Sequence, residues 1–195
     1  MKKAYYLYRP HPHYGEFYPG KVLSVISDPK IILRYCAKPD LLNKYMANGV
    51  GPHGLSLLTS GGKGGPPVSE QMTELTFELV RQMCYPNAPS RLSSLYAAET
   101  IGGAMMWDSI LRRNFGNQYG QVPDSLWEIE FETEARSYDA RWLDIPPHDG
   151  FSMLYQLEYA HNYWKELSTP NALYELLVPY PVTVVRKIKD LPDAP

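Results

Sequence analysis

The chain has 195 residues, a formal net charge of -2 at pH 7 and a hydrophobic fraction of 44%. These values argue against disorder and predict a single folded domain over residues 1–195. The small net charge also argues against a general DNA-binding module, although a nucleic-acid substrate remains possible through a local basic patch.

Tyrosine is abundant, with 16 copies, which suits a protein that lines a groove or meets a partner. The 2 cysteines form no CxxC motif, so neither a disulfide framework nor a zinc site is predicted. The opening stretch MKKAYYLYRPHPHYG lacks the apolar core of a signal peptide, and no run approaches the roughly 18 apolar residues of a membrane span. We therefore expect a cytoplasmic protein without a membrane partner.

In the first part of the chain, KAYYLYR (3–9) and GKVLSVIS (20–27) predict two strands, the first of which ends at Arg9. KPDLLNKYMANG (38–49) predicts a short helix. The glycine- and proline-rich segment 50–68 contains GGKGG, but no Ser or Thr follows its lysine as a P-loop requires. We interpret this segment as a mobile lid or linker.

The strongest helix signal lies in SEQMTELTFELVRQMCYP (69–86). We expect its apolar stripe to face the core, through Met72, Leu75, Leu79 and Met83. The rest of the chain predicts a strand at LSSLYA (92–97), a helix over 100–115, a strand over 125–134 with its acids toward water, a short element over 135–144, a helix over 152–167 and a final strand pair. Interspersed helices and short strands indicate an α+β fold.

One carboxylate interrupts the apolar stretch NALYELLVPYPVTVV (171–185). Side-chain alternation places Glu175 with Leu173 and Leu177 on one face of a strand. An ionised carboxylate buried without partners costs several kcal/mol, so Glu175 is either paired, hydrogen-bonded or facing a cleft, or it lies on an edge strand in water. The residues alone leave both readings open.

Several chemistries lack their motifs. The chain has no GxSxG and no HExxH, and its five histidines form no ligand set, so no metal site is predicted. Glu128, Glu130 and Glu132 are the candidates for the acidic metal cluster of a nuclease. Alternating surface acids explain these three residues better.

Three stretches far apart in the chain remain, namely Arg9, PSRLSSLYA and LYELLVP. Their order resembles the mono-ADP-ribosyltransferase pattern, in which a basic residue ends the first strand, a serine- or tyrosine-containing strand precedes a central helix, and a glutamate lies in a late strand. The phrases ELTFELVRQMCYPNAPSRLSSLYAAE, LWEIEFE, YDARWLD, HNYWK and LYELLVPYPVTVV more closely resemble an uncharacterised bacterial family of that type. The resemblance implies a split mixed or antiparallel β core with flanking helices.

The resemblance also implies that NAD is consumed as a substrate and that no metal is needed. Glu175 would be the catalytic carboxylate that bonds a ribose hydroxyl. Arg9 would bind the anionic part of NAD or its adenine-side ribose, unless it only pairs with a surface acid. Tyr96 would stack on the nicotinamide, unless it is ordinary core, and Ser93 or Ser94 would orient Glu175.

Two further residues are candidates for substrate contact. Arg91 follows Ser90 in a short SR sequence that also suits a turn or a helix cap. His53 lies in the expected lid, where a solvated loop histidine is the alternative.

The implied activity is transfer of ADP-ribose from NAD to a nucleic acid or a non-arginine protein site. Arginine-modifying members carry a second acid two residues before the catalytic one, and this chain has Leu173 there. Such an enzyme would be a toxin or a phage-defence effector, with an antitoxin as a possible partner. The alternative is a non-catalytic protein of the same fold that binds a partner.

Overall fold

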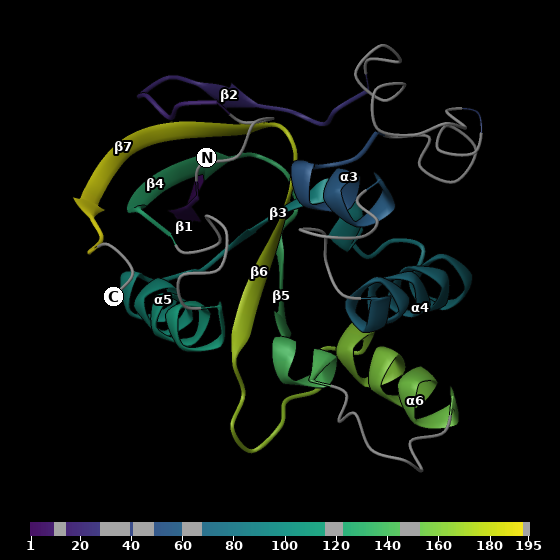
Figure 1. Ribbon diagram of the computed structural model, residues 1–195. Coiled ribbons are helices and arrows are strands. Elements are labelled where there is room, and N and C mark those ends of the chain that lie inside the picture. Colours follow the sequence, from purple (N-terminus) through teal and green to yellow (C-terminus); the bar gives the residue numbers. More distant parts are fainter. Residues whose placement is uncertain are drawn as a thin grey trace.

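The computed structural model describes residues 1–9, 15–27, 40, 49–59, 68–115, 123–144 and 153–192. Within this part, the chain forms two antiparallel sheets, so the expected α+β class is confirmed (Figure 1). The larger sheet has the order β1-β4-β7-β2, with β1 at Lys2–Tyr8, β4 at Ser125–Phe131, β7 at Val182–Asp190 and β2 at Val22–Leu23. The smaller sheet has the order β3-β6-β5, with β3 at Ser94–Ala97, β6 at Tyr174–Pro179 and β5 at Arg136–Asp139.

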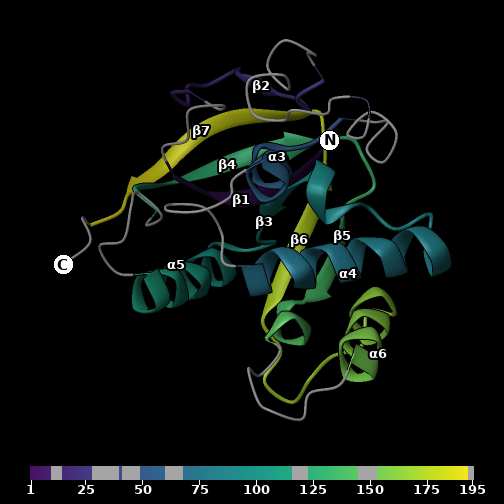
Figure 2. The same ribbon diagram turned by 45° about the vertical axis from the view of Figure 1, so that its right-hand side comes forward.

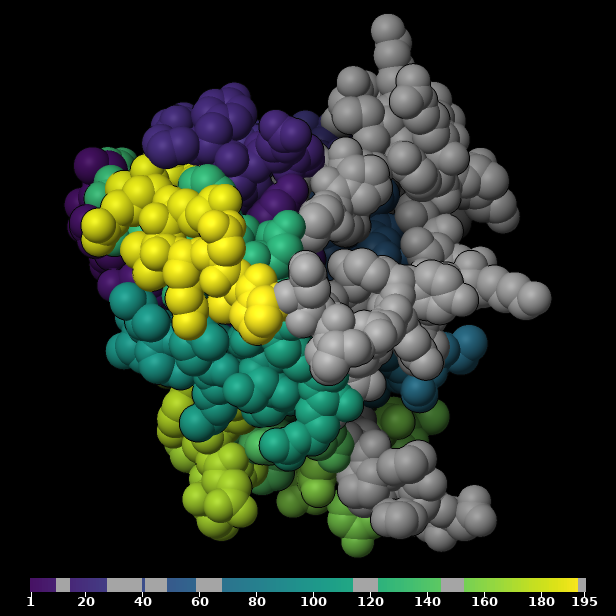
Figure 3. Space-filling view, turned by 60° about the vertical axis from the view of Figure 1, so that its left-hand side comes forward, coloured from purple at the N-terminus to yellow at the C-terminus, as the bar shows by residue number. Residues whose placement is uncertain are grey.

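The described helices are α3 at Pro52–Thr59, α4 at Val68–Cys84, α5 at Ile101–Phe115 and α6 at Met153–Trp164. Figure 1 shows α4 and α6 side by side on one side of the smaller sheet, with α5 on the other side. Figure 3 shows β2, β7 and α5 along one side of the molecule. None of the helices in the described ranges is long and apolar enough to cross a membrane.

The two sheets share one core and one continuous stretch of chain. Only Tyr180 and Pro181 separate β6 from β7. Leu176 and Val178 of β6 pack with Trp127 and other side chains of the larger sheet. Because β6 is the central strand of its sheet, the edge-strand reading of Glu175 is wrong.

Helix α4 lies where the sequence predicts a helix, but the expected buried face is wrong. The buried side chains are those of Glu74, Phe77, Glu78 and Val80. The apolar stripe Met72, Leu75, Leu79 and Met83 is exposed instead. The reason is that arginines satisfy both carboxylates, Arg91 that of Glu74 and Arg81 that of Glu78, which hydrophobic periodicity does not reveal.

The acids of β4 also differ from expectation. β4 lies between β1 and β7, and Glu128 is buried on it. Glu128 accepts hydrogen bonds from Lys3 of β1 and from Arg186 of β7, at 2.6 and 2.8 Å. The prediction that this strand turns its acids toward water is therefore wrong for Glu128.

The first part of the expected lid is a packed helix. In α3, Leu55 and Leu57 are buried, and the amide of Gly51 donates to the carbonyl of Leu92 at 2.8 Å. Gly54 lies so close to this carbonyl that an added Cβ would collide with it. Residues 60–67 and nearly all of the predicted helix 38–49 lie outside the described part of the chain.

Candidate functional site

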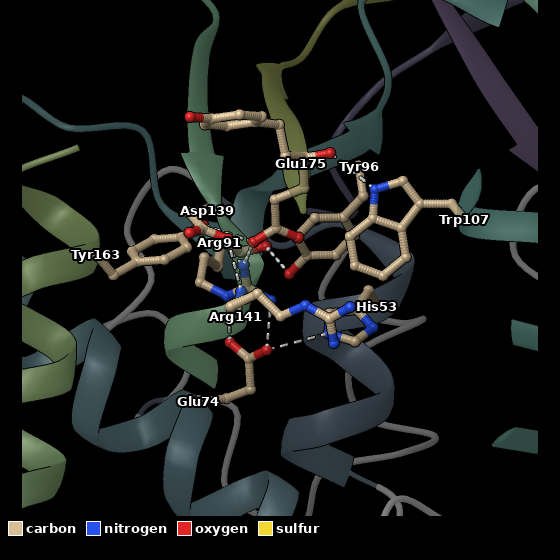
Figure 4. A network of polar contacts seen from close by, with 10 residues as sticks. His53, Glu74, Arg91, Tyr96, Trp107, Asp139, Arg141, Tyr163 and Glu175 are labelled. Atoms are coloured by element: carbon tan, nitrogen blue, oxygen red, sulfur yellow. Dashed lines mark hydrogen bonds and ion pairs between the residues drawn. The ribbon is translucent and has the colours of Figure 1, made fainter. Parts of the chain in front are cut away.

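Side chains from five separate parts of the chain, α3, α4, the segment 91–96, α6 and β6, meet on the face of the smaller sheet that α4 and α6 cover (Figure 4). The strand register explains part of this convergence. Tyr96 of β3 pairs with Leu177, and Tyr138 of β5 pairs with Glu175, so all four side chains lie on one face. The other face of β6 carries Leu176 and packs against the larger sheet.

Arg91 is the centre of the cluster. It lies in a short 3-10 turn, Arg91–Ser93, before β3, and it is buried. Its Nε and Nη2 each donate to one carboxylate oxygen of Glu74 at 2.8 Å, which is the bidentate geometry that suits a guanidinium. Its Nη1 donates to the hydroxyl of Tyr163 at 2.8 Å and to Oε1 of Glu175.

Glu175 is 5% exposed and faces Arg91 and Tyr163 rather than bulk water. The hydroxyl of Tyr163 donates to Oε1 at 2.7 Å, so both hydrogen bonds to this carboxylate end on the same oxygen. Oε2 accepts none from the residues that the structure describes. Of the readings that the sequence leaves open for Glu175, the structure thus shows the paired and hydrogen-bonded one.

The positive and negative groups of the cluster do not balance, because the single guanidinium of Arg91 pairs with two buried carboxylates. Burial alone would raise the pKa of Glu74, but Arg91 and the nearby His53 hold that pKa well below its usual range. Burial also raises the pKa of Glu175, and here Arg91 and Tyr163 offset it only in part. The site thus pairs an ionised carboxylate with one of raised proton affinity.

His53 forms the outer edge of the cluster, since its side chain is 30% exposed. Its ring meets the ring of Tyr96 edge to face at 4.8 Å, and its Nε2 lies 3.8 Å from Oε1 of Glu74. Tyr96 donates from its hydroxyl to the carbonyl of Arg91 at 2.8 Å, and the guanidinium of Arg91 lies 4.9 Å from the centre of its ring. Tyr96 is therefore held between His53 and Arg91.

Helix α4 fixes the segment that carries Arg91. Glu78, one turn after Glu74, accepts two hydrogen bonds from Arg81 and one from the hydroxyl of Ser90 at 2.8 Å. Ser90 also accepts a hydrogen bond from the amide of Leu92, so its predicted capping role is confirmed. Two buried acids of one helix thus hold both Ser90 and Arg91.

The structure brings together four of the candidate residues and leaves three apart. His53, Arg91, Tyr96 and Glu175 belong to the cluster. Ser94 is buried, but its hydroxyl meets no partner within the described residues, so Arg91 and Tyr163 hold the Glu175 carboxylate instead. Ser93 ends the 3-10 turn, and Arg9 follows β1 in the larger sheet, away from these contacts.

Sequence reasoning missed Glu74 and Tyr163 as members of the site. The sequence held a sign of the burial of Glu74. Glu74 and Glu78 share one helix face with Phe77, and Glu70 is the one other acid of this helix. Tyr163 lies in HNYWK, where no spacing sets it apart from the other tyrosines. In the described ranges, no group of three or more His, Cys, Asp and Glu could hold a metal ion.

A shallow hollow of about 430 Å³ lies elsewhere on the smaller sheet. It is lined by residues from the start of α5 and by Ser137, Tyr174 and Leu176. Ser137 pairs with Leu176 in the register, so these side chains lie on the face of β6 that Glu175 does not share. The hollow is therefore separate from the cluster.

The fold and the site define an α+β protein with two antiparallel sheets and a buried cluster of arginine, glutamate and tyrosine. Residues 47–190 match the family described as "Protein of unknown function (DUF2441)", and the chain belongs to this family. The matched range includes every member of the cluster. A comparison with the curated proteins finds no match.

Proposed function

We propose that the chain is a mono-ADP-ribosyltransferase of ADP-ribosyltransferase-like fold, which uses NAD as a consumed substrate at the cluster around Glu175. The observation that carries the proposal is the convergence of Glu175 and Tyr96 with His53 and Arg91, from remote parts of the sequence, on one face of β6. The residues alone and the family resemblance both single out Glu175.

In the proposed reaction, the bond between C1′ of the ribose and the nicotinamide nitrogen breaks, and its electron pair leaves with neutral nicotinamide. An acceptor oxygen or nitrogen then bonds to C1′ and loses its proton to a carboxylate or to water. Positive charge develops on the ribose between these events, and a fixed acid in a dry site stabilises it strongly. Glu175 suits this role, because its Oε2 accepts no hydrogen bond from a described residue and so has capacity for a ribose hydroxyl.

The other members of the cluster take different roles in this proposal. Arg91 and Tyr163 position the Glu175 carboxylate through Oε1. His53 and Tyr96 lie on the more exposed side and would contact the nicotinamide or its ribose. The acceptor is a nucleic acid or a non-arginine protein site, since Leu173 occupies the position of the second acid.

The test is transfer of label from NAD to RNA, DNA or a cell extract by purified protein, with release of nicotinamide measured in parallel. Wild type should transfer label, and Glu175→Gln should lose about 100-fold or more of this activity. Glu128→Gln is the matched control, because Glu128 is also a buried, ion-paired acid but lies in the larger sheet. Equal activity of wild type and Glu175→Gln would refute the role of this carboxylate.

One observation favours a second candidate function, a non-catalytic protein of the same fold that binds a partner. Glu175 is buried and bonded to Arg91 and Tyr163, as a purely structural ion pair would be. This candidate predicts that wild type neither transfers label nor releases nicotinamide with any acceptor, while substitutions in the cluster still reduce stability.

A further inference from the structure

The exposed face of α4 is apolar and carries no charge. Its exposed apolar side chains are Val68, Met72, Leu75, Leu79 and Met83, at 73, 50, 47, 46 and 82%. The other exposed residues of the helix are Ser69, Gln82 and Cys84. An uncharged apolar face of this length is unusual on a solvated helix and marks an interaction surface.

This face lies opposite the one that α4 turns to the cluster. The buried face carries Glu74, Phe77 and Glu78, which contact Arg91, Trp164 and Ser90. Figure 2 shows α4 lengthwise at the front of the molecule, with α6 below it and the sheets behind. The usual arrangement of an amphipathic helix is therefore reversed here, because two of its three acids, Glu74 and Glu78, point inward while the apolar stripe points outward.

The spacing of four positions in the stripe favours a second copy of the helix as the occupant. The positions 68, 72, 75 and 79 are separated by four, three and four residues, so the pattern reads the same in both directions. An antiparallel copy of the helix would place Val68 opposite Leu79 and Met72 opposite Leu75, and the reverse pairs would follow by symmetry. Such alternation of three and four residues is the seam along which helices interlock.

We propose that α4 pairs antiparallel with α4 of a second copy of this chain, in a two-fold symmetric dimer. The face suits an isologous contact, because no exposed side chain on it would bring like charges together. The four seam side chains, Val68, Met72, Leu75 and Leu79, present on the order of 400 Å² in each copy, so the seam itself would bury on the order of 800 Å², the size of a weak, transient contact. The dimer should therefore be reversible. This inference does not rest on the proposed function.

The first test is sedimentation velocity of the full chain over a wide concentration range. Wild type should shift from monomer to dimer as concentration rises, and Met72→Glu should remain monomeric because it places two like charges in the seam. Met106→Glu is the matched control, since Met106 is a similarly exposed helical methionine, on α5. It should dimerise like wild type. A wild type that stays monomeric, or a Met72→Glu that dimerises equally well, would overturn the proposal.

The second test reads the direction of the helices. In a background that carries both Cys36→Ser and Cys84→Ser, Val68→Cys and Leu79→Cys proteins are mixed and oxidised. The antiparallel seam predicts a disulfide between the two different variants and little between identical ones. Efficient linkage of Val68→Cys to itself would show a parallel pair and would overturn the proposed geometry. Because the substituted side chains are exposed, both variants should fold, which circular dichroism checks.

Discussion

Arg91, in the turn before β3, donates a hydrogen bond to Glu175 of β6, 84 residues later in the chain. The same guanidinium holds Glu74 of α4 through two further hydrogen bonds. One side chain thus links a turn, a helix and the central strand of the smaller sheet. The contribution of Arg91 and of each of its partners to stability can be tested by substituting them one at a time.

Arg91→Met should destabilise the fold by about 3–5 kcal/mol, because it leaves two buried carboxylates without their cation. Urea unfolding measures the loss. Arg141→Met is the control, since Arg141 is partly exposed and pairs with the exposed Asp144, and such pairs contribute about 0–1 kcal/mol. Similar losses for the two variants would show that the cluster does not hold the fold.

The two acids of the cluster should have opposite effects on the pH dependence of stability. The pKa of Glu74 lies below its ordinary value of 4.5 in the folded protein, so its contribution is present above that pH and is lost as the pH falls. The pKa of Glu175 is raised above 4.5, so its contribution is greatest below that pH and is lost as the pH rises through the folded value.

The measurement is the free energy of unfolding of wild type, Glu74→Gln and Glu175→Gln as a function of pH. The stability advantage of wild type over Glu74→Gln should shrink as the pH falls below about 4.5. Glu175→Gln should gain on wild type as the pH rises above about 4.5, because its neutral amide avoids burial of a second negative charge. Parallel curves for all three proteins would contradict both assignments.

Two stacked tyrosines should respond differently to loss of the hydroxyl. Tyr138 and Tyr163 have ring centres 4.6 Å apart, but only Tyr163 bonds Arg91 and Glu175. Tyr163→Phe should cost about 1–3 kcal/mol, because it leaves buried polar groups short of a partner.

Tyr138→Phe is the matched control. The hydroxyl of Tyr138 is buried without a hydrogen bond from the described residues, and burial raises its pKa to about 12. Its removal should be neutral or stabilising in thermal unfolding. A larger loss for Tyr138→Phe than for Tyr163→Phe would contradict the hydrogen-bond pattern.

Gly54→Ala should destabilise the protein by about 1–3 kcal/mol, because the new methyl group would collide with the carbonyl of Leu92 and push α3 away. His53 would move with the helix. Gly102→Ala in α5 is the control, as the nearest atom to its new methyl group lies at 3.8 Å. Alanine there should stabilise by roughly 0.5–1 kcal/mol. Unfolding by denaturant distinguishes the two, and equal effects would show that the α3 contact is not tight.

Local patterns predicted most of the elements. The strand at β4 and the helices α5 and α6 lie where alternation and helical spacing indicate them. The cost of burying a charge also predicted that Glu175, if buried, would have partners. The α+β class follows from these local signals together.

The buried face of α4 could not be predicted from the sequence, because it depends on partners that are distant in the chain. The acid at 74 is buried only because Arg91 reaches it across 17 residues, and Tyr163 joins from 72 residues beyond Arg91. Hydrophobic periodicity instead selects Met72 and Leu79, which are exposed. The helix α3 was missed because its proline and glycine are typical of a loop, whereas Gly54 permits close packing.

The short link between β6 and β7 determines how the two sheets unfold. β6 is the central strand of one sheet and β7 is an interior strand of the other. Detachment of either strand from its sheet would therefore disturb the other sheet. The reciprocal hydrogen bonds between Tyr5 and Ala98 join the sheets a second time. The two sheets should therefore open in a single cooperative event, and their slowest-exchanging amides should share one free energy of opening.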